Sequence, residues 1–255
     1  MVINPTAIYV LWLREMKRFV RAKSRVFGAL AMPLFFLAFL GLGFNRMSIP
    51  GMAGGVPYVN FLVPGIIGMT MLFTSVMGGM SVLWDREFGF LKEIMVAPVS
   101  RVSIVLGRIA GGTTTALIQG IMILAISTAA GFRVARPGSY AVAFLFLILI
   151  ATAFLGLGLI FASWMKDMQG FGIVMNFVIF PIFFLSGALY PVANLPRWVR
   201  VLSYADPLTY GIDGLRGALI HVSARPLLFD LAVMAGISVA MVFLGAYFFE
   251  KSKSI

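Results

Sequence analysis

The sequence predicts an all-α integral membrane protein with six transmembrane helices and both ends in the cytoplasm. Three observations predict this: six long uncharged stretches, a very apolar composition, and an uneven distribution of lysine and arginine among the loops. The uncharged stretches are residues 26–44, 47–84, 109–132, 137–165, 168–196 and 231–249. A helix needs about 20 residues to cross a hydrocarbon layer of about 30 Å, and it satisfies its own backbone polar groups. The predicted spans are about 26–44, 60–83, 106–131, 139–163, 170–189 and 229–249, all within one transmembrane domain of residues 26–255.

The composition argues against a soluble protein and against most kinds of cofactor site. Hydrophobic residues make up 61% of the chain and charged residues 11%, whereas soluble domains have about 45–50% and about 25%. The chain has no cysteine and a single histidine, His221, so we expect no disulfide, metal site or cofactor. Its net charge of +11 is spread over the loops and forms no compact patch. We therefore expect contacts with membrane lipids and none with nucleic acid.

The lysines and arginines indicate the orientation of the protein in the membrane. With six spans, thirteen of these residues fall on the side of the two termini and seven on the opposite side. The larger group comprises Arg14, Lys17, Arg18, Arg21, Lys23, Arg25, Arg86, Lys92, Arg101, Arg108, Lys166, Lys251 and Lys253. The smaller group comprises Arg46, Arg133, Arg136, Arg197, Arg200, Arg216 and Arg225. Cytoplasmic loops carry the excess of positive charge, so both termini are predicted to be cytoplasmic in a multi-pass protein of the cytoplasmic (inner or plasma) membrane.

Residues 1–25 are predicted to form a separate amphipathic helix in the cytoplasmic membrane interface. Asn4 can cap this helix, and Pro5 suits its first turn. At about 100° per residue, cations share one arc and large apolar residues lie on the other side. The cations are Arg14, Lys17, Arg18, Arg21 and Arg25, and the apolar residues are Ile8, Leu11, Trp12, Met16, Phe19 and Val20. Cations on such a helix face anionic headgroups. The pattern fits either a topology anchor or a lever that connects a cytoplasmic partner to the first span.

The loop of residues 84–108 is longer and more apolar than a simple connection requires. Apolar residues recur there at helical spacing, charges of both signs lie mostly elsewhere, and Pro98 ends the helix. The apolar positions are Trp84, Phe88, Leu91 and Met95. A short amphipathic helix of this kind suits docking into a cleft on another protein, although a helix on the lipid surface shows the same pattern. The predicted coupling residues are Glu87, Phe88 and Leu91, together with Arg14 and Glu15 of the N-terminal helix.

Residues 190–225, after the fifth span, are predicted to form short re-entrant helices in the outer leaflet. Pro191 and Pro196 break the chain, and Asp206 caps a helix that reaches about Ile220. About 14 residues cannot span a bilayer. Asp213 and Arg216 lie three residues apart and are expected to pair across one turn. These features are typical of a gate or lid, and a plain extracellular loop is the alternative. The predicted gate residues are Pro191, Trp198, Asp206, Pro207, Tyr210 and Arg216.

The spans lack the groups that would power transport from within this chain. No charged residue or histidine lies inside the uncharged stretches, whereas ion-coupled carriers place ionisable residues at mid-membrane. None of the six lysines follows a glycine, so there is no phosphate-binding loop. The chain has neither an ion-coupling site nor a nucleotide-binding loop, yet it has a helix suited to docking. We therefore interpret it as one subunit of a transporter whose energy comes from a partner protein. An ion-coupled secondary carrier is the alternative; a membrane-embedded hydrolase would need a Ser/His pair or paired aspartates in the spans.

Four segments then carry a resemblance to a known family. LWLREMKRFVRAKSRVFGALAMPLFF is similar to an interfacial connecting helix and first span, and FLVPGIIGMTMLFTSVMGG to a second span. WDREFGFLKEIMVAPVSRVSIVLGR is similar to a coupling region. The most specific segment is FFLSGALYPVANLPRWVRVLSYADPLTYGIDGLRGAL, which follows span five. Over nearly its whole length, the chain resembles the permease subunits of ATP-binding-cassette (ABC) exporters of the type-2 class.

The resemblance implies the function and the partners of the chain. It implies outward transport of a drug, a lipid or a lipid-linked glycan across the cytoplasmic membrane, with drug and antibiotic exporters the most similar. It also implies that two separate ATP-binding subunits bind ATP and magnesium and that this chain has no catalytic residue. A second permease copy, giving a homodimer, is expected. Small residues that allow close helix contacts are Gly107, Gly111, Gly156 and Gly158.

The resemblance further implies that spans two and five line the substrate path. The candidate path residues are Met69, Phe73, Met77, Asn176, Phe180 and Phe184. Methionine and phenylalanine surfaces adapt to varied apolar ligands. The same residue types are also common as packing and lipid-facing residues, so the pattern alone leaves both interpretations open.

Overall fold

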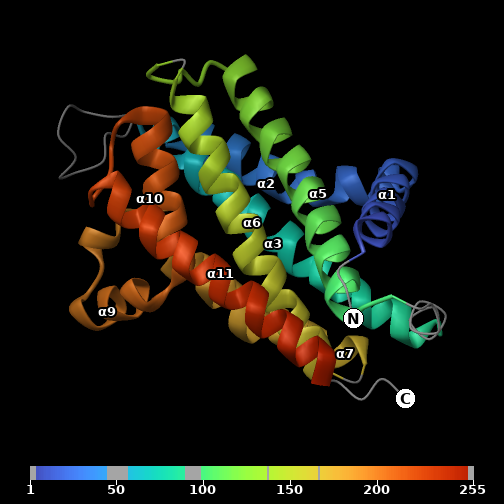
Figure 1. Ribbon diagram of the computed structural model, residues 1–255. Coiled ribbons are helices and arrows are strands. Elements are labelled where there is room, and N and C mark those ends of the chain that lie inside the picture. Colours follow the sequence, from blue (N-terminus) through green and yellow to red (C-terminus); the bar gives the residue numbers. More distant parts are fainter. Residues whose placement is uncertain (1–3, 45–56, 90–98, 137, 166, 252–255) are drawn as a thin grey trace.

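The computed structural model describes residues 4–44, 57–89, 99–136, 138–165 and 167–251, and the regular structure in these ranges is helical (Figure 1). The long helices are α2 (Lys23–Gly43), α3 (Tyr58–Glu87), α5 (Arg101–Ala129), α6 (Ser139–Trp164) and α11 (Leu227–Lys251). The short ones are α1 (Pro5–Arg21), α7 (Met168–Val174), a π-helical turn (Met175–Ile179), α8 (Phe180–Leu185), a 3₁₀ turn (Val192–Asn194), α9 (Arg197–Ala205) and α10 (Pro207–Ile220).

Among the described residues, five helical segments are long and apolar enough to cross a membrane on their own. They are α3, α5, α6, α11 and the continuous segment Met168–Leu185, which contains α7, the π-helical turn and α8. A sixth candidate is the pair α1 and α2, which are bent by 68° relative to each other. The chain is therefore an all-helical integral membrane protein, as predicted.

The two ends of the described chain lie on the same side of the molecule. The Asn4 backbone N–H donates to the Ser103 hydroxyl at 2.9 Å, and Arg101 donates to the Glu250 carbonyl at 2.6 Å. Both contacts are made to the first turn of α5. Two ends on one side require an even number of crossings, so the pair α1 and α2 is needed as a sixth crossing beside the other five. This agrees with six spans.

Helices α3 and α6 form the centre of the bundle and approach each other closely (Figure 1). A Cβ placed on Gly79 would lie 2.4 Å from the carbonyl carbon of Gly158, closer than any real Cβ contact. Gly156 is likewise covered by Met241 of α11, and Gly107 and Gly111 by Leu11 and Glu15 of α1. The glycines that the sequence suggested for contact with a second copy are thus occupied within one chain, and they carry no argument for a dimer.

The segment after the fifth span forms two short helices, as predicted, but the second helix is deeply packed. Helix α9 lies on the periphery, whereas α10 contacts α3, α6 and α11 (Figure 1). A Cβ on Gly214 would lie 2.1 Å from the Phe146 ring, and one on Gly211 would lie 2.7 Å from Ile150. Close packing at these glycines seats α10 between the spans.

Candidate functional site: an ionic cluster and a neighbouring cavity

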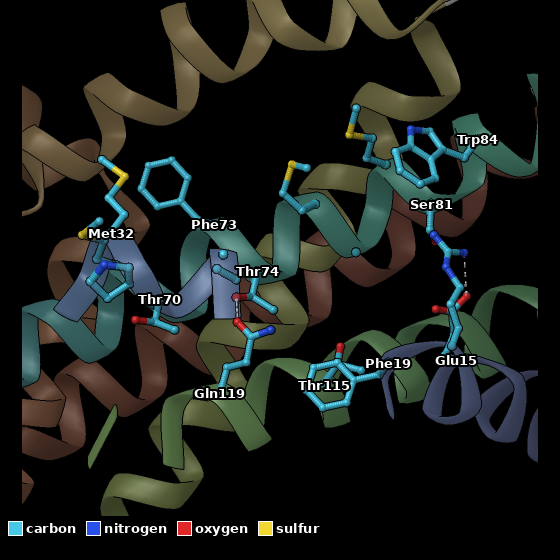
Figure 2. Close-up of a pocket in the computed structure, with 18 residues that line it drawn as sticks. Glu15, Phe19, Met32, Thr70, Phe73, Thr74, Ser81, Trp84, Thr115 and Gln119 are labelled. Carbon is cyan, nitrogen blue, oxygen red and sulfur yellow. Dashed lines mark hydrogen bonds and ion pairs between the residues drawn. The ribbon is translucent and has the colours of Figure 1, made fainter. Parts of the chain in front are cut away.

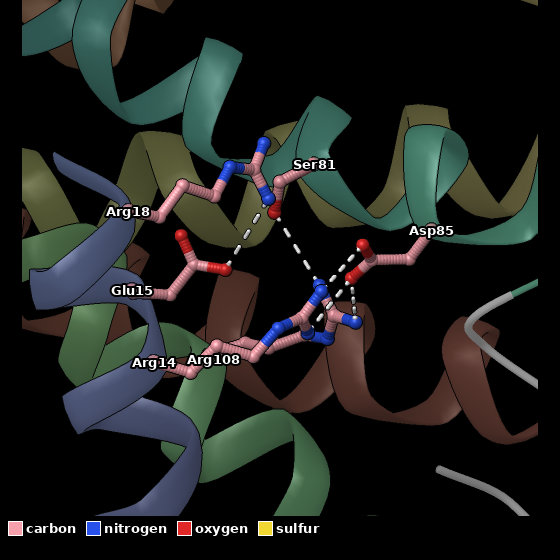
Figure 3. Close-up of polar contacts among 6 residues, drawn as sticks. All are labelled: Arg14, Glu15, Arg18, Ser81, Asp85 and Arg108. Atoms are coloured by element: carbon pink, nitrogen blue, oxygen red, sulfur yellow. Dashed lines mark hydrogen bonds and ion pairs between the residues drawn. The ribbon is translucent and has the colours of Figure 1, made fainter. Parts of the chain in front are cut away.

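Three helices meet at a buried ionic cluster on the side predicted to be cytoplasmic (Figure 3). The Asp85 carboxylate near the end of α3 accepts hydrogen bonds from Arg14 of α1 at 2.7 and 3.1 Å. It also accepts one from Arg108 of α5 at 2.5 Å. Arg108 donates a further bond to the Ser81 hydroxyl at 3.3 Å. Asp85 and Arg108 are both buried. Because a buried charge is costly without a partner, these contacts tie α1, α3 and α5 to one another.

The sequence of α1 places Arg14 at this cluster. The Asn4 side chain caps the helix by accepting from the Thr6 and Ala7 N–H groups, as predicted. Leu11 lies against Gly107 of α5, and the Trp12 indole N–H donates to the Thr114 hydroxyl at 3.1 Å. These contacts fix the rotation of α1 about its axis. The expectation that Arg14 faces lipid headgroups is therefore wrong for this residue, because α1 packs on α5 and turns Arg14 toward Asp85.

The predicted coupling residues are only partly described. Helix α3 runs without a break through Trp84 and ends at Glu87. The prediction that Trp84 belongs to a separate amphipathic helix is therefore wrong, because Trp84 extends the second span. Glu87 is exposed, and the Phe88 side chain, which follows it, is 81% exposed. Leu91, Met95 and Pro98 lie outside the described residues. Phe88 is thus an uncovered aromatic side chain one turn beyond the buried Asp85.

Beside the ionic cluster lies a cavity of about 380 Å³ between α1, α2, α3 and α5 (Figure 2). Its apolar wall consists of Phe19, Met32, Met69, Phe73, Met77, Met80 and Trp84. Its polar residues are Thr70, Thr74, Ser81, Thr115 and Gln119, with Glu15 and Arg18 at one end. Arg18 and Glu15 lie 3.7 Å apart and form an ion pair. The size falls within the usual range of small-molecule sites, about 300–1,000 Å³.

Only half of the predicted path residues line this cavity. Met69, Phe73 and Met77 of α3 do so. Phe180 is not part of the lining but packs against Phe73, and the two ring centroids lie 5.0 Å apart. Asn176 and Phe184 lie on exposed surface of the fifth span and are not part of the lining.

Sequence reasoning missed the polar lining of the cavity and the cluster beside it. Asp85 directly follows one uncharged stretch and Arg108 directly precedes the next. Successive spans are antiparallel, so the sequence could have predicted that these two opposite charges lie at the same end of neighbouring helices. Gln119 was visible as a strongly polar residue within an apolar run. The Thr74 hydroxyl donates to the Gln119 side-chain carbonyl at 2.6 Å, but nothing in the sequence links these two residues.

One predicted gate residue, Arg216, is bound to backbone carbonyls and is not paired with Asp213. Arg216 donates to the backbone carbonyls of Phe61, Gly187 and Ala188 at 2.8–3.3 Å, and its guanidinium lies 3.5 Å from the Phe61 ring centroid. Asp213 instead accepts from the Ala224 and Arg225 N–H groups. The predicted Asp213–Arg216 pair is wrong, because each side chain has partners on other elements that helical spacing does not reveal.

The other predicted gate residues lie around the start of α10. Asp206 caps the helix by accepting from the Leu208 N–H at 2.9 Å, and Pro207 occupies its first position, as predicted. The Tyr210 hydroxyl donates to the Tyr204 carbonyl at 2.7 Å. Trp198 on α9 is 70% exposed, and Pro191 is half-buried. The cap geometry is confirmed, whereas a gating role for these residues stays a prediction.

Comparison with known proteins identifies the family. The ABC-2 type transporter family matches residues 6–220 of the chain. The chain belongs to this family. It is 30% identical over 237 residues to the inner membrane transport permease YadH of Escherichia coli strain K12, with 92% of this chain and 91% of YadH covered. It is 27% identical to the putative transport permease ycf38 of Cyanophora paradoxa, with 85% and 76% covered. It is also 27% identical to nodulation protein J of Sinorhizobium fredii, with 87% of each covered.

Membership in the ABC-2 family settles the general role of the chain. It is the membrane subunit of a transporter and works with an ABC ATP-binding subunit, so it is not itself the catalytic component. Together with the apolar helices, the similarity to an inner membrane permease makes it a multi-pass protein of the cytoplasmic membrane.

Proposed function

We propose that this permease exports a hydrophobic or amphipathic substrate outward across the cytoplasmic membrane. The substrate is a drug, a lipid or a lipid-linked glycan, and multidrug efflux is one form of this activity. A homodimer of the chain would act with two copies of the ATP-binding subunit, which bind ATP and magnesium. The observation that carries the proposal is the ionic cluster of Arg14, Asp85 and Arg108, which lies between the exposed Phe88 and the cavity.

The contacts suggest how ATP hydrolysis would be coupled to the cavity. A force on Phe88 reaches Asp85 within one helical turn of α3, and Asp85 holds Arg14 of α1. Helix α1 in turn supplies Glu15, Arg18 and Phe19 to the cavity lining. Movement of α3 against α5 would therefore shift α1 as well and change the shape of the cavity. Coupling in this sense requires that the three helices stay joined while they move.

The test is reconstitution of the permease with its ATP-binding subunit in inside-out vesicles. Export predicts ATP-dependent accumulation of substrate inside the vesicles, blocked by vanadate and insensitive to a protonophore. Phe88→Ala should uncouple hydrolysis from accumulation, because burying a large apolar side chain at the contact contributes about 1.5–3 kcal/mol. Tyr140→Ala, at an exposed aromatic residue at the start of α6, is the matched control and should keep hydrolysis coupled to accumulation. Accumulation driven by a proton gradient without ATP would instead support a secondary carrier.

A further inference from the structure

The cavity between α1, α2, α3 and α5 is lined by an amide whose N–H groups have no hydrogen-bond acceptor among the described residues. Gln119 is 4% exposed and lines the cavity. Its side-chain carbonyl accepts from Thr74, and no hydrogen bond donated by its amide N–H groups is found among the described residues. A donor that faces a largely apolar cavity without a protein partner gains free energy when a ligand brings an acceptor to it. In Figure 2, the Gln119 side chain extends from α5 toward the space below Phe73 and Thr74.

The other polar groups of the cavity are largely engaged with the protein. The Thr70 hydroxyl donates to the Ile66 carbonyl and the Thr115 hydroxyl to the Gly112 carbonyl, both at 2.8 Å. The Ser81 hydroxyl accepts from Arg108. The Ser81 O–H lies beside the ionic cluster, so the amide donor available next to Phe73 and Thr74 is that of Gln119. It suits an acceptor such as a carbonyl or ether oxygen.

The charges at the cavity compensate one another. Glu15 and Arg18 are the charged residues of its lining, and they pair at 3.7 Å. Arg18 also lies 5.7 Å from the Trp84 ring centroid. Asp85, one helical turn beyond Ser81 of the lining, is held by two arginines. A permanently charged ligand placed among the methionines and phenylalanines would leave water without gaining a countercharge, which is unfavourable.

We infer that this cavity is a binding site for uncharged, largely apolar molecules that present a hydrogen-bond acceptor to Gln119, and that it discriminates against cationic amphiphiles. The inference rests on the proposed function, since it names the class of substrate that the exporter takes up. Methionines in the wall let the site accept different apolar shapes. The acceptor contact with Gln119 then selects among them. Thr74 acts as a positioning residue that fixes the orientation of the Gln119 amide.

Two dyes that share a ring system provide the probe. Nile red is uncharged and has a ring carbonyl, whereas Nile blue is cationic and has an amino group in place of that oxygen. Saturable binding of each is measured by fluorescence on the full chain in nanodiscs, with empty nanodiscs of the same lipid subtracted. We expect Nile red to bind at least about tenfold more tightly than Nile blue.

Variants of the cavity locate the binding. Gln119→Leu keeps the size of the side chain and removes the donor, so Nile red binding should weaken about three- to tenfold. Ala29→Phe leaves every hydrogen bond in place and fills the cavity from α2, so it should abolish saturable binding. Gln169→Leu, at an exposed residue of α7, is the matched control and should bind both dyes like the wild type. If thermal unfolding shows that Gln119→Leu is unstable, the Nile red binding of Ala29→Phe decides whether the dye occupies this cavity.

The results separate this inference from the proposed function. Equal binding of the two dyes, or unchanged Nile red binding in both cavity variants, would overturn the inference. Because no ATP-binding subunit is present in this assay, such a failure leaves ATP-driven export unaffected. Conversely, absence of ATP-driven accumulation in vesicles would overturn the proposal of export. The dye measurements would still show which molecules bind in the cavity.

Discussion

At the scale of single residues, Asp206 combines a structural and an electrostatic role. Its side chain caps α10 through the Leu208 N–H and lies 3.4 Å from the Thr209 hydroxyl. Burial raises the pKa of this carboxyl to about 7, against the opposing effect of the two hydrogen bonds. In the unfolded chain, the pKa of an aspartate is about 3.9. The folded protein therefore binds the proton more tightly than the unfolded chain does.

This difference predicts a pH-dependent stability with a definite sign. The contribution of Asp206 is fully present below about pH 4 and is lost as the pH rises through about 7. Asp206→Asn keeps a capping oxygen but cannot ionise, so its melting temperature should fall less between pH 5 and pH 8 than that of the wild type. Asp206→Ala also cannot ionise, so it should lose about 1 kcal/mol relative to Asp206→Asn at every pH through loss of the cap. Equal pH dependence in wild type and Asp206→Asn would contradict this account.

At the scale of helices, the Asp85 carboxylate joins α3 to both α1 and α5. Asp85→Asn removes the countercharge of Arg14 and Arg108. Breaking a buried ion pair costs about 3–5 kcal/mol, so thermal unfolding in detergent should shift to markedly lower temperature. Glu15→Gln, which breaks the part-exposed pair with Arg18, should cost about 0–1 kcal/mol. Adding Arg108→Met to Asp85→Asn should recover part of the loss, because it removes the unpaired buried charge. A mild effect of Asp85→Asn would show that other contacts hold α1.

The helices themselves were largely predictable, because each property that defines them is local. Uncharged length predicted α6, and the Asp206–Pro207 start with an end near Ile220 predicted α10 at its observed bounds. The partners of polar side chains were less accessible. Spacing along α10 placed Asp213 beside Arg216, whereas the backbone carbonyls that bind Arg216 come from distant elements. Glycine spacing likewise shows that a helix can approach another closely, but not which helix.

At the scale of the whole molecule, the exposed faces of the spans differ in polarity. Helix α11 exposes an apolar face that includes Val239 and Phe243, as expected for contact with lipid. The fifth span exposes Asn176 within its π-helical turn, beside Phe177, which is 78% exposed. A polar side chain is unfavourable against hydrocarbon, and π-turns are frequent at functional sites. The fifth span is therefore the better candidate for the face that meets a second copy or a water-filled path.

This asymmetry predicts where a dimer can be crosslinked. The chain has no cysteine, so Phe177→Cys introduces a unique thiol on the fifth span and Val239→Cys one on α11. In a two-fold dimer, a residue near the axis meets its own counterpart. Oxidation in membranes should therefore give a covalent dimer with Phe177→Cys and monomer with Val239→Cys at equal expression. Phe39→Cys on the first span, where the side chain is 64% exposed, tests whether α2 shares this face. Crosslinking through Val239→Cys alone would place the interface on α11, and a monomer that exports in reconstituted vesicles would refute the homodimer.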